Sequence, residues 1–465
     1  MRENNCFLWR SCGRKAGTQT GTGIEKSKAV VCHVIVFCVL LLLLWGMLIV
    51  SSLIPNESLR ENMEKSALTY REKDAFSFEN GRKWNGISDN YADTILLNIS
   101  WNMGNGNPLF SSLDTWYYDG EELGESVGLY LSVTEEGVQP NVDYSRYWHG
   151  SAVFIRLLHL VTDVEGIKLI GLLAALLPAL LTLGILAKYG HVDLAAAFLL
   201  SMGAVQIWNI RLSLEYQPAF IICFLLCPFY LWAERKRESL LTYLSVAGGV
   251  TIAFFDFLTT ETVTIVFPLI LVTAVRAAEG RLGSLKRNVR SFVLCGFGWI
   301  GAYAGTFTVK WAAVSLATGN NKFLAALSSA EERFGGSLQA TGTDNPVLRI
   351  PMAVAANLTV LFGGEERVEP VRIIMGILFI FLIMGSVLYL FYQKESNKDG
   401  IKLLLMQGMV VFLRYMVLNN HSYMHEFFTY RALISPVMAG LAGGILSVKS
   451  CPRFSALNVS EWRKK

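Results

Sequence analysis

The sequence predicts an all-α polytopic membrane protein with about ten transmembrane helices and a large extracytoplasmic loop after the first helix. Of the 465 residues, 52% are hydrophobic and only 17% are charged, and the mean hydropathy is +0.40. About a quarter of the residues in an average soluble protein are charged. The apolar residues also form long runs that short polar segments separate. These observations exclude a disordered chain, a fibre and an ordinary soluble enzyme.

Residues 29–54 form the clearest span, because their VIVFCVLLLLLWGMLIV core is longer than the apolar core of a signal peptide. The polar leader is long and no small-residue cleavage site follows, so the sequence predicts a retained anchor. A span needs about 20 mainly apolar residues, and nine further segments approach this length. The ten predicted spans are residues 29–54, 165–187, 192–209, 213–233, 239–257, 260–277, 291–313, 369–393, 400–418 and 430–447.

Lysine and arginine set the orientation of these spans, because cytoplasmic loops carry an excess of both. Residues 1–28 carry six of them and are predicted to be cytoplasmic. Residues 347–362 are apolar but short and contain a proline, so we expect them to lie in the outer interface or to re-enter. The basic segments 394–402 and 448–465 then both lie inside. The sequence predicts a multi-pass protein of the plasma membrane with both termini cytoplasmic.

The loop after the first span is acidic and is the one sizeable exterior domain. Between residues 55 and 150 it holds 16 Asp and Glu residues against 7 Lys and Arg residues. All eight cysteines fall in spans or on the inner side, so no exterior disulfide is expected. The predicted parts are a basic cytoplasmic tail (1–28), a first transmembrane helix (29–54), an acidic extracytoplasmic loop with a juxtamembrane helix (55–164), a transmembrane core (165–313), an extracytoplasmic loop with an interfacial or re-entrant helix (314–368), C-terminal transmembrane helices (369–447) and a cytoplasmic tail (448–465).

Ionisable residues near the spans gather on the predicted outer side. Each costs about 2.5–3.5 kcal/mol at the centre of a span, so each needs a reason. Taken singly they fit ordinary roles, such as an acidic turn, a helix cap, a lysine that reaches the interface or two interfacial histidines. Together they indicate a site on the outer face. The segments SDNYADTILLNIS, DYSRYWHGS, AFFDFLTTET, TFTVKWAAV and NNHSYMHEFFTYR contribute Asp89, Asp93, Arg146, Tyr147, Trp148, His149, Asp256, Glu261, Lys310, His421, His425 and Arg431.

These residue types suit group transfer from a lipid phosphate. A phosphate leaving group needs cations that stabilise its charge, and an acceptor hydroxyl needs a carboxylate that takes its proton. The sequence has no phosphate-loop, CxxC or HExxH pattern, so ATPase and thiolate-zinc chemistry are unsupported. The net charge of +4 is too small to indicate a nucleic-acid partner, and the expected partner is the lipid bilayer.

The anchor span, the long acidic outer loop, the RYWH run that leads into the next helix and about ten spans resemble the GT-C superfamily of integral-membrane glycosyltransferases. The resemblance covers about residues 29–447. It implies an inverting hexosyl- or pentosyltransferase that moves a sugar from a polyprenyl-phosphate donor to a hydroxyl acceptor on the outer face. The acceptor would be a cell-envelope glycan, a lipid or a protein.

The resemblance also implies roles for the outer residues. The acidic base of the family maps to Asp89 or Asp93, and Asp89 is preferred because it lies closer to the polar SDN approach. This pair follows the first span by about 35 residues, later than in the better-known members. The implied contacts to the donor phosphate are Arg146, Lys310, His421, His425 and Arg431. The implied contacts to substrate are Tyr147, Trp148, His149, Asp256 and Glu261.

A divalent cation, Mg or Mn, is used by some members of this superfamily and not by others. Carboxylate oxygens are suitable ligands for such ions. The spacing of the candidate carboxylates does not decide between the two cases. The candidates are Asp89, Asp93, Asp256 and Glu261.

Three other interpretations remain open from the sequence. A flippase or transporter of lipid-linked sugars needs charged groups near mid-membrane, whereas the middles of the predicted spans are nearly free of charge. A lipid-linked polysaccharide polymerase or ligase would also act at the outer face, but it would use a large outer loop later in the chain. A purely structural scaffold would need none of the outer charges for chemistry.

Overall fold

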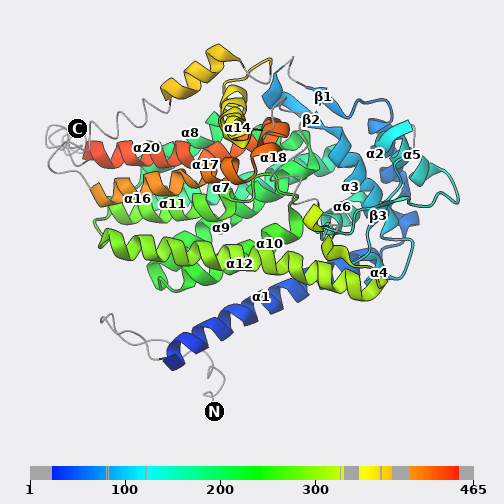
Figure 1. The fold of residues 1–465 in the computed structure, drawn as a ribbon, viewed down its shortest axis with the longest axis horizontal. Helices are drawn as coiled ribbons and strands as arrows, with labels where there is room; N and C mark the ends of the chain where they lie inside the picture. The colour runs from blue at the N-terminus through cyan, green and yellow to red at the C-terminus, as the bar shows by residue number, and fades with distance from the viewer. Residues whose placement is uncertain are drawn as a thin grey trace.

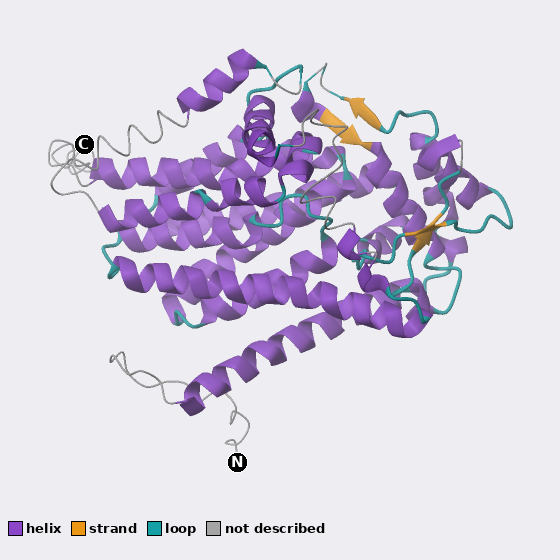
Figure 2. Cartoon of the chain, in the orientation of Figure 1, coloured by secondary structure: helices purple, strands orange, loops and turns teal. Residues whose placement is uncertain are grey.

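The computed structural model describes residues 23–79, 81, 83–120, 123–324, 326–328, 345–366, 369–379 and 398–449. These residues are mostly helical, with two small sheets of two strands each, so the prediction of an all-α class is confirmed at that level (Figure 2). Six helical segments among them are long and apolar enough to cross a membrane. Most of the long helices run side by side in one bundle, and a smaller domain covers one end of it (Figure 1).

The bundle contains helices of very different length. Its elements are α1 (Gly23–Ser52), α7 (Val164–Lys188), α8 (Val192–Ala204), α9 (Gln217–Lys236), α10 (Leu240–Phe255), α11 (Val263–Ala278), α12 (Leu285–Thr318), α16 (Lys398–Gly408), α17 (Val410–Val417) and α20 (Ile434–Lys449). The short 3₁₀ helices η5 (Ile207–Leu212) and η6 (Leu214–Tyr216) join α8 to α9.

The predicted count of ten spans is only partly reflected in helix lengths. The six candidate spans coincide with predicted spans, but α8, α10 and α11 have only 13, 16 and 16 residues. The predicted span 369–393 is helical over Pro370–Phe379, and residues 380–393 lie outside the described residues. Both predicted terminal tails also lie almost entirely outside them.

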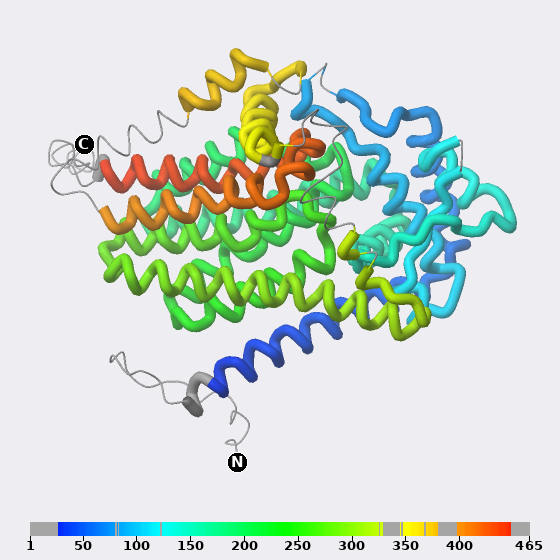
Figure 3. The backbone as a smooth tube through the Cα atoms, viewed as in Figure 1, coloured from blue at the N-terminus to red at the C-terminus, as the bar shows by residue number. Residues whose placement is uncertain are grey.

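Close helix packing holds the centre of the bundle together. A Cβ atom on Gly249 of α10 would lie 2.4 Å from the carbonyl oxygen of Trp299 on α12, so only glycine permits this approach. The two helices run alongside each other in Figure 3. Leucine, isoleucine and phenylalanine side chains from most of the helices form one continuous apolar core around this contact.

The domain at the end of the bundle is built from the long loop after α1. Its elements are α2 (Arg60–Tyr70), β1 (Phe76–Phe78), β2 (Ile87–Asp89), α3 (Asn90–Asn102), α4 (Pro108–Ser111), β3 (Trp116–Tyr117), α5 (Gly124–Thr134), β4 (Val142–Asp143) and α6 (Ala152–His159). The strands pair antiparallel as β1–β2 and β3–β4. In Figure 1 this domain lies opposite the ends of the bundle where α1 begins and α20 finishes.

A buried arginine fixes this domain to the bundle. Arg156 of α6 donates hydrogen bonds to the carbonyl oxygens of Ser51 at 2.9 Å and of Ser100 at 2.6 Å. Ser51 lies at the end of α1 and Ser100 in α3. These hydrogen bonds fix the position of α3 relative to α1, and therefore the position of the residues at the N-terminus of α3.

Helix α14 (Pro346–Leu361) lies across the direction of the bundle helices (Figure 1). It packs on α18 (Asn419–Met424) and α19 (Glu426–Thr429). Asn357 donates a hydrogen bond to the carbonyl oxygen of Ser422 at 2.8 Å and accepts one from the Thr429 hydroxyl at 2.8 Å. Helix α14 therefore braces the segment that carries the two histidines of the last predicted outer loop.

Candidate functional site

A polar cavity lies where the domain meets the end of the bundle. It contains about 780 Å³ of space, part of which is open to solvent. Segments far apart in the sequence form its walls: β1, the β2–α3 junction, the segment before α6, η6, the turn after α10, and α18 with α19. Its lining residues are Phe76, Asp89, Tyr91, Ala92, Ile95, Leu96, Tyr144, His149, Glu215, Phe257, His421, His425 and Phe428. The cavity brings together four of the predicted site residues: Asp89, His149, His421 and His425.

Asp89 is the best-placed carboxyl group in this cavity. It ends β2 and caps the N-terminus of α3, where its Oδ1 atom accepts a hydrogen bond of 2.9 Å from the Ala92 amide. Only 3% of the residue is exposed. Burial, together with the charge of nearby Asp93, raises the pKa of Asp89 from 3.8 to about 7. A carboxyl group with this pKa can take up or release a proton near neutral pH.

Glu215 also lines the cavity, and the sequence analysis missed it. It lies in η6, and its carboxyl group forms a hydrogen bond with the carboxyl group of Asp89. A signal for it was present, because an acidic residue at the outer end of the predicted span 213–233 carries a cost that demands a reason.

His149 presents an unoccupied hydrogen-bond acceptor to the cavity. Its Nε2 atom lies 2.8 Å from the carbonyl oxygen of Tyr144 and must donate to it. Burial lowers the pKa of His149 to about 3, so the ring is neutral and Nδ1 is an acceptor. Among the described residues Nδ1 has no hydrogen-bond partner. The backbone of His149 has a φ of 55°, an uncommon conformation for a residue with a side chain.

Gly150 holds this strained turn against α10. Its amide donates a hydrogen bond of 3.0 Å to the carbonyl oxygen of Phe254, and a Cβ atom would lie 2.3 Å from the Phe254 ring. Only glycine therefore permits this approach to α10, which fixes the preceding histidine at the cavity.

His421 and His425 lie one turn apart, in α18 and at its end. Their ring centres are 4.7 Å apart, and the His425 ring stacks on Phe428 at 5.2 Å. Both rings line the same wall of the cavity. Two imidazoles in this position can donate hydrogen bonds to an anionic group in the cavity.

Arg414, which the sequence analysis did not single out, connects this wall to the turn after α10. Its guanidinium contacts Glu261 at 2.8 and 3.1 Å, the Leu258 carbonyl at 2.7 Å and the Ser422 hydroxyl at 3.1 Å. Glu261 is therefore an ion-pair partner and does not line the cavity. The pair positions Phe257, which does line it.

Asp256 and Asp93 are buried beside the cavity and engaged by their own partners. Asp256 accepts hydrogen bonds from the amide, at 2.9 Å, and the hydroxyl group of Thr259, so it caps the turn after α10. Asp93 pairs with Lys168 of α7 at 2.9 Å. It also accepts hydrogen bonds from the Tyr70 hydroxyl at 2.7 Å, the Ser213 hydroxyl at 2.6 Å and the Leu214 amide at 2.7 Å.

Of the predicted contacts to the donor phosphate, the two histidines line the cavity, whereas the lysine and the two arginines do not. The two arginines lie close to its walls. The Arg146 guanidinium stacks on Tyr144, a lining residue, at 4.1 Å. Arg431 is buried against Tyr216 at 4.7 Å, and the Tyr216 ring packs on Phe428.

The aromatic residues that precede His149 in the RYWH run are part of the packing around the cavity. Tyr147 packs on Phe257 and Phe307, with ring centres 5.2 and 6.1 Å away. Trp148 is buried in the bundle core and donates a hydrogen bond of 2.9 Å to the carbonyl oxygen of Thr306. Neither residue lines the cavity.

Lys310 of α12 does not line the cavity and fastens the domain at the end of the bundle to that helix. Its ammonium group donates to the carbonyl oxygens of Ser112 at 3.3 Å and Leu113 at 2.7 Å. We expect Lys310→Met to lower the free energy of unfolding by about 1–3 kcal/mol, because both buried carbonyls lose their donor. Unfolding in denaturing detergent, followed by tryptophan fluorescence, measures this change in the free energy of unfolding. A weaker apparent affinity for substrate with unchanged stability would instead place Lys310 in the binding site.

A long apolar groove adjoins the polar cavity on the side of the bundle. It encloses about 1000 Å³ between α1, α6, α7, α9 and α10. Its lining residues Ser151, Leu214 and Phe255 lie within two residues of His149, Glu215 and Phe257 of the cavity. The rim residues Met47, Phe154 and Leu225 are exposed on the apolar surface. The groove thus opens toward the apolar surface that a bilayer would cover, and three of the segments that line it also line the cavity.

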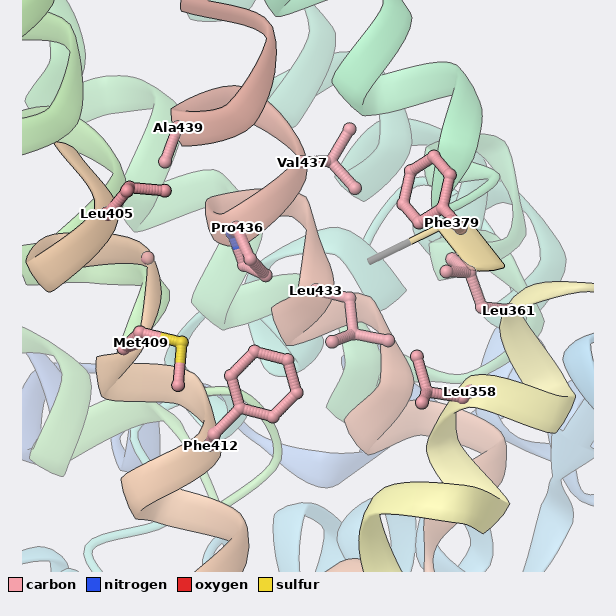
Figure 4. A pocket seen from close by; sticks show the side chains of 11 residues that line it. Leu358, Leu361, Phe379, Leu405, Met409, Phe412, Leu433, Pro436, Val437 and Ala439 are labelled. Carbon is pink, nitrogen blue, oxygen red and sulfur yellow. The ribbon is translucent and has the colours of Figure 1, made fainter. Parts of the chain in front are cut away.

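A third cavity, of about 550 Å³, lies between α14, α16, α17 and α20 (Figure 4). Leu358, Met409, Phe412 and Leu433 are among the side chains that point into it. All the described residues that line it are apolar, so it offers no group for acid–base chemistry.

Within the described part of the chain, no three or more His, Cys, Asp or Glu residues are grouped so that they could hold a metal ion. Comparison with known proteins does not assign the chain to a family. No protein-family model, no curated protein and no solved structure matches it.

Proposed function

We propose that the protein is an inverting membrane glycosyltransferase of the GT-C type, which moves a sugar from a polyprenyl-phosphate donor to a hydroxyl acceptor on the outer face of the plasma membrane. The acceptor would be a cell-envelope glycan, a lipid or a protein. The observation that carries the proposal is the closeness of two spaces, whose lining residues are neighbours in the sequence: a polar cavity with a titratable carboxyl group and an apolar groove with exposed apolar residues at its rim.

In this proposal Asp89 is the general base. The acceptor hydroxyl oxygen attacks the anomeric carbon, its proton passes to the Asp89 carboxylate, and the bond between that carbon and the phosphate oxygen breaks with its electron pair. The products are the glycosylated acceptor and the polyprenyl phosphate. A base is most effective when its pKa lies near the working pH, and burial gives Asp89 a pKa of about 7. Asp93 is left out of this role because four donors already occupy its carboxylate.

The leaving phosphate needs positive charge or hydrogen-bond donors. His421 and His425 line the cavity and are the nearest candidates, with Arg146 and Arg431 behind the lining residues that they contact. Lys310 is assigned to the structure of the domain instead, because two backbone carbonyls hold its ammonium group.

The other lining residues suit a sugar ring. Tyr91, Tyr144 and Phe257 give the cavity aromatic walls, on which the apolar face of a pyranose or furanose packs well. The Nδ1 atom of His149 offers a fixed acceptor for a sugar hydroxyl. The cavity therefore combines apolar stacking surfaces with a few oriented polar groups, as small-molecule sites do.

The direct test incubates the purified protein in detergent with a panel of polyprenyl-phosphate sugars and candidate glycan, lipid and peptide acceptors. We expect loss of sugar from at least one lipid donor and no loss from the matching nucleotide sugar. Donor binding without any turnover, together with movement of the lipid between leaflets of proteoliposomes, would indicate a flippase and contradict the proposal.

A substitution in the groove tests whether the donor is a lipid. Ala174 lines the groove on α7, and Ala174→Trp would fill part of the space that the isoprenoid chain needs. We expect the KM of a long-chain donor to rise about tenfold or more, and that of a short-chain analogue to change less. Leu173→Trp is the matched control, because Leu173 is 49% exposed on the same helix and does not line the groove. Equal effects of both substitutions would show that the groove does not hold the donor.

A further inference from the structure

The segment that carries Glu215 is tied to the start of α3 from both sides. The Ser88 hydroxyl donates a hydrogen bond of 2.6 Å to the carbonyl oxygen of Leu212. The Ser213 hydroxyl and the Leu214 amide donate to the Asp93 carboxylate at 2.6 and 2.7 Å. The chain between η5 and η6 is thus held against β2 and α3. This brings the Glu215 side chain to Asp89.

The Asp89 and Glu215 carboxyl groups are hydrogen-bonded to each other, and this contact requires a proton. Two carboxyl groups in hydrogen-bonding contact do not both ionise readily, because the repulsion between two carboxylates strongly favours protonation of one of them. Among the described residues, no lysine or arginine forms an ion pair with either group, and Lys168 pairs with Asp93 instead. One proton therefore neutralises one member of the pair.

The hydrogen bonds indicate which member keeps the proton. Asp89 accepts a backbone hydrogen bond from Ala92 at the positive N-terminus of α3, and both effects favour its ionised form. Among the described residues, no backbone amide donates to the Glu215 carboxyl group. Glu215 is the better donor and Asp89 the better acceptor.

Other titratable and charged groups face this pair from every neighbouring element. Asp93 and Asp256 add negative charge close by, which makes a second negative charge on the pair less favourable. Lys168 is a cation close enough to act on Asp89, Arg431 acts on the neighbouring Tyr216, and His149 is neutral. The full set is Tyr91, Asp93, Tyr144, His149, Lys168, Tyr216, Asp256, His421, His425 and Arg431.

We propose that Glu215 is a positioning residue that stays protonated and donates its hydrogen bond to the Asp89 carboxylate, so that the two residues form a dyad with one shared proton. The inference rests on the proposed function only where it names Asp89 as the base. In that function Glu215 fixes the rotamer of Asp89, whose carboxylate oxygens keep lone pairs that can accept the proton of the acceptor hydroxyl. It also keeps the cavity from holding two negative charges where a phosphate must bind.

Infrared titration of the purified protein tests the dyad without any assay of activity. The carbonyl stretch of a protonated carboxyl group is followed from pH 5 to 9 in the wild type and in Glu215→Gln, Glu215→Ala and Asp89→Asn. We expect a protonated carboxyl signal that persists above neutral pH in the wild type and is absent from Glu215→Gln. We expect a second signal that disappears near neutral pH and is absent from Asp89→Asn.

The two Glu215 variants separate hydrogen bonding from packing. Glutamine keeps a donor, so the Asp89 midpoint should stay close to that of the wild type, whereas alanine should raise it by about one pH unit or more. The same shift should appear in the pH dependence of sugar transfer. Equal midpoints in all Glu215 variants, or a midpoint that moves when a chelator is added, would overturn the dyad. Failure of every donor assay with the expected infrared result would overturn the proposed function and leave the dyad standing.

Discussion

Asp89→Asn is expected to lower the rate of sugar transfer by about 10²–10⁴-fold, the usual contribution of a positioned general base. Asparagine can still accept the Ala92 hydrogen bond that caps α3, so the fold should persist. What it cannot do is take the proton of the acceptor hydroxyl. The measurement is initial rate at saturating donor in detergent, and circular dichroism of the same sample reports the helical content.

The pH dependence of the wild type follows from the same assignment. Asp89 must be ionised to act as a base, and burial places its pKa at about 7, so the rate should rise with pH through that value. Asp89→Asn should remove this dependence from the residual activity. Unchanged activity of Asp89→Asn would rule out the general-base role.

The stability of the wild type should fall with pH over the range in which its rate rises, and Asp89→Asn should not show this fall. Burial raises the pKa of Asp89 in the folded protein from 3.8 to about 7, so the folded state holds this proton more tightly than the unfolded state. The stabilisation is complete below pH 4 and is lost as the pH rises to 7. Asparagine does not ionise, so the melting temperature of the variant should exceed that of the wild type above pH 7 and approach it near pH 4. A difference in melting temperature that does not vary with pH would contradict the raised pKa of Asp89.

The sequence predicted one part of this arrangement, the gathering of ionisable residues on one side of the spans. Ionisable residues are costly beside apolar spans, and the alternation of spans put Asp89, His149, His421 and His425 on one side. The structure places these four around one cavity, although nothing in their spacing along the chain predicts a distance between them.

The sequence could not separate cavity residues from buried ion pairs. Asp93 and Glu261 carry the same chemistry as Asp89, but Lys168 and Arg414 neutralise them. Each partner lies at least 75 positions away, so only the packing of the helices decides the pairing. Both cations lie near the predicted outer ends of spans. The cost of a charge at such positions indicates that each has a partner or a function.

Hydropathy also could not set the ends of the shorter helices. Helix α8 finishes at Ala204 because the chain turns there, with Gln206 in the left-handed region at φ 51°. Helix α10 finishes where Asp256 caps the following turn. Apolar residues continue beyond both points, so a window of hydropathy extends the predicted spans 192–209 and 239–257 past the helices.

Lys168→Met is expected to destabilise the protein by about 3–5 kcal/mol, because it removes the cation from a buried ion pair and leaves the Asp93 carboxylate uncompensated. Only 5% of the lysine side chain and none of the aspartate side chain is exposed. Unfolding by sodium dodecyl sulfate in mixed micelles, followed by tryptophan fluorescence, measures the loss.

The double variant Asp93→Asn, Lys168→Met separates the charge from the shape of the site. It has no buried charge to compensate, so it should recover a large part of the stability that Lys168→Met loses. The matched control is Lys65→Met, which breaks a 2.7 Å pair with Glu61 whose side chains are 54% and 84% exposed. Water screens an exposed pair, so the stability of this control should change far less than that of Lys168→Met. If Lys168→Met were no more harmful than Lys65→Met, the buried ion pair would contribute little to the stability of the protein. The Ser213 hydroxyl and the Leu214 amide, rather than the ion pair, would then hold η6 against α3.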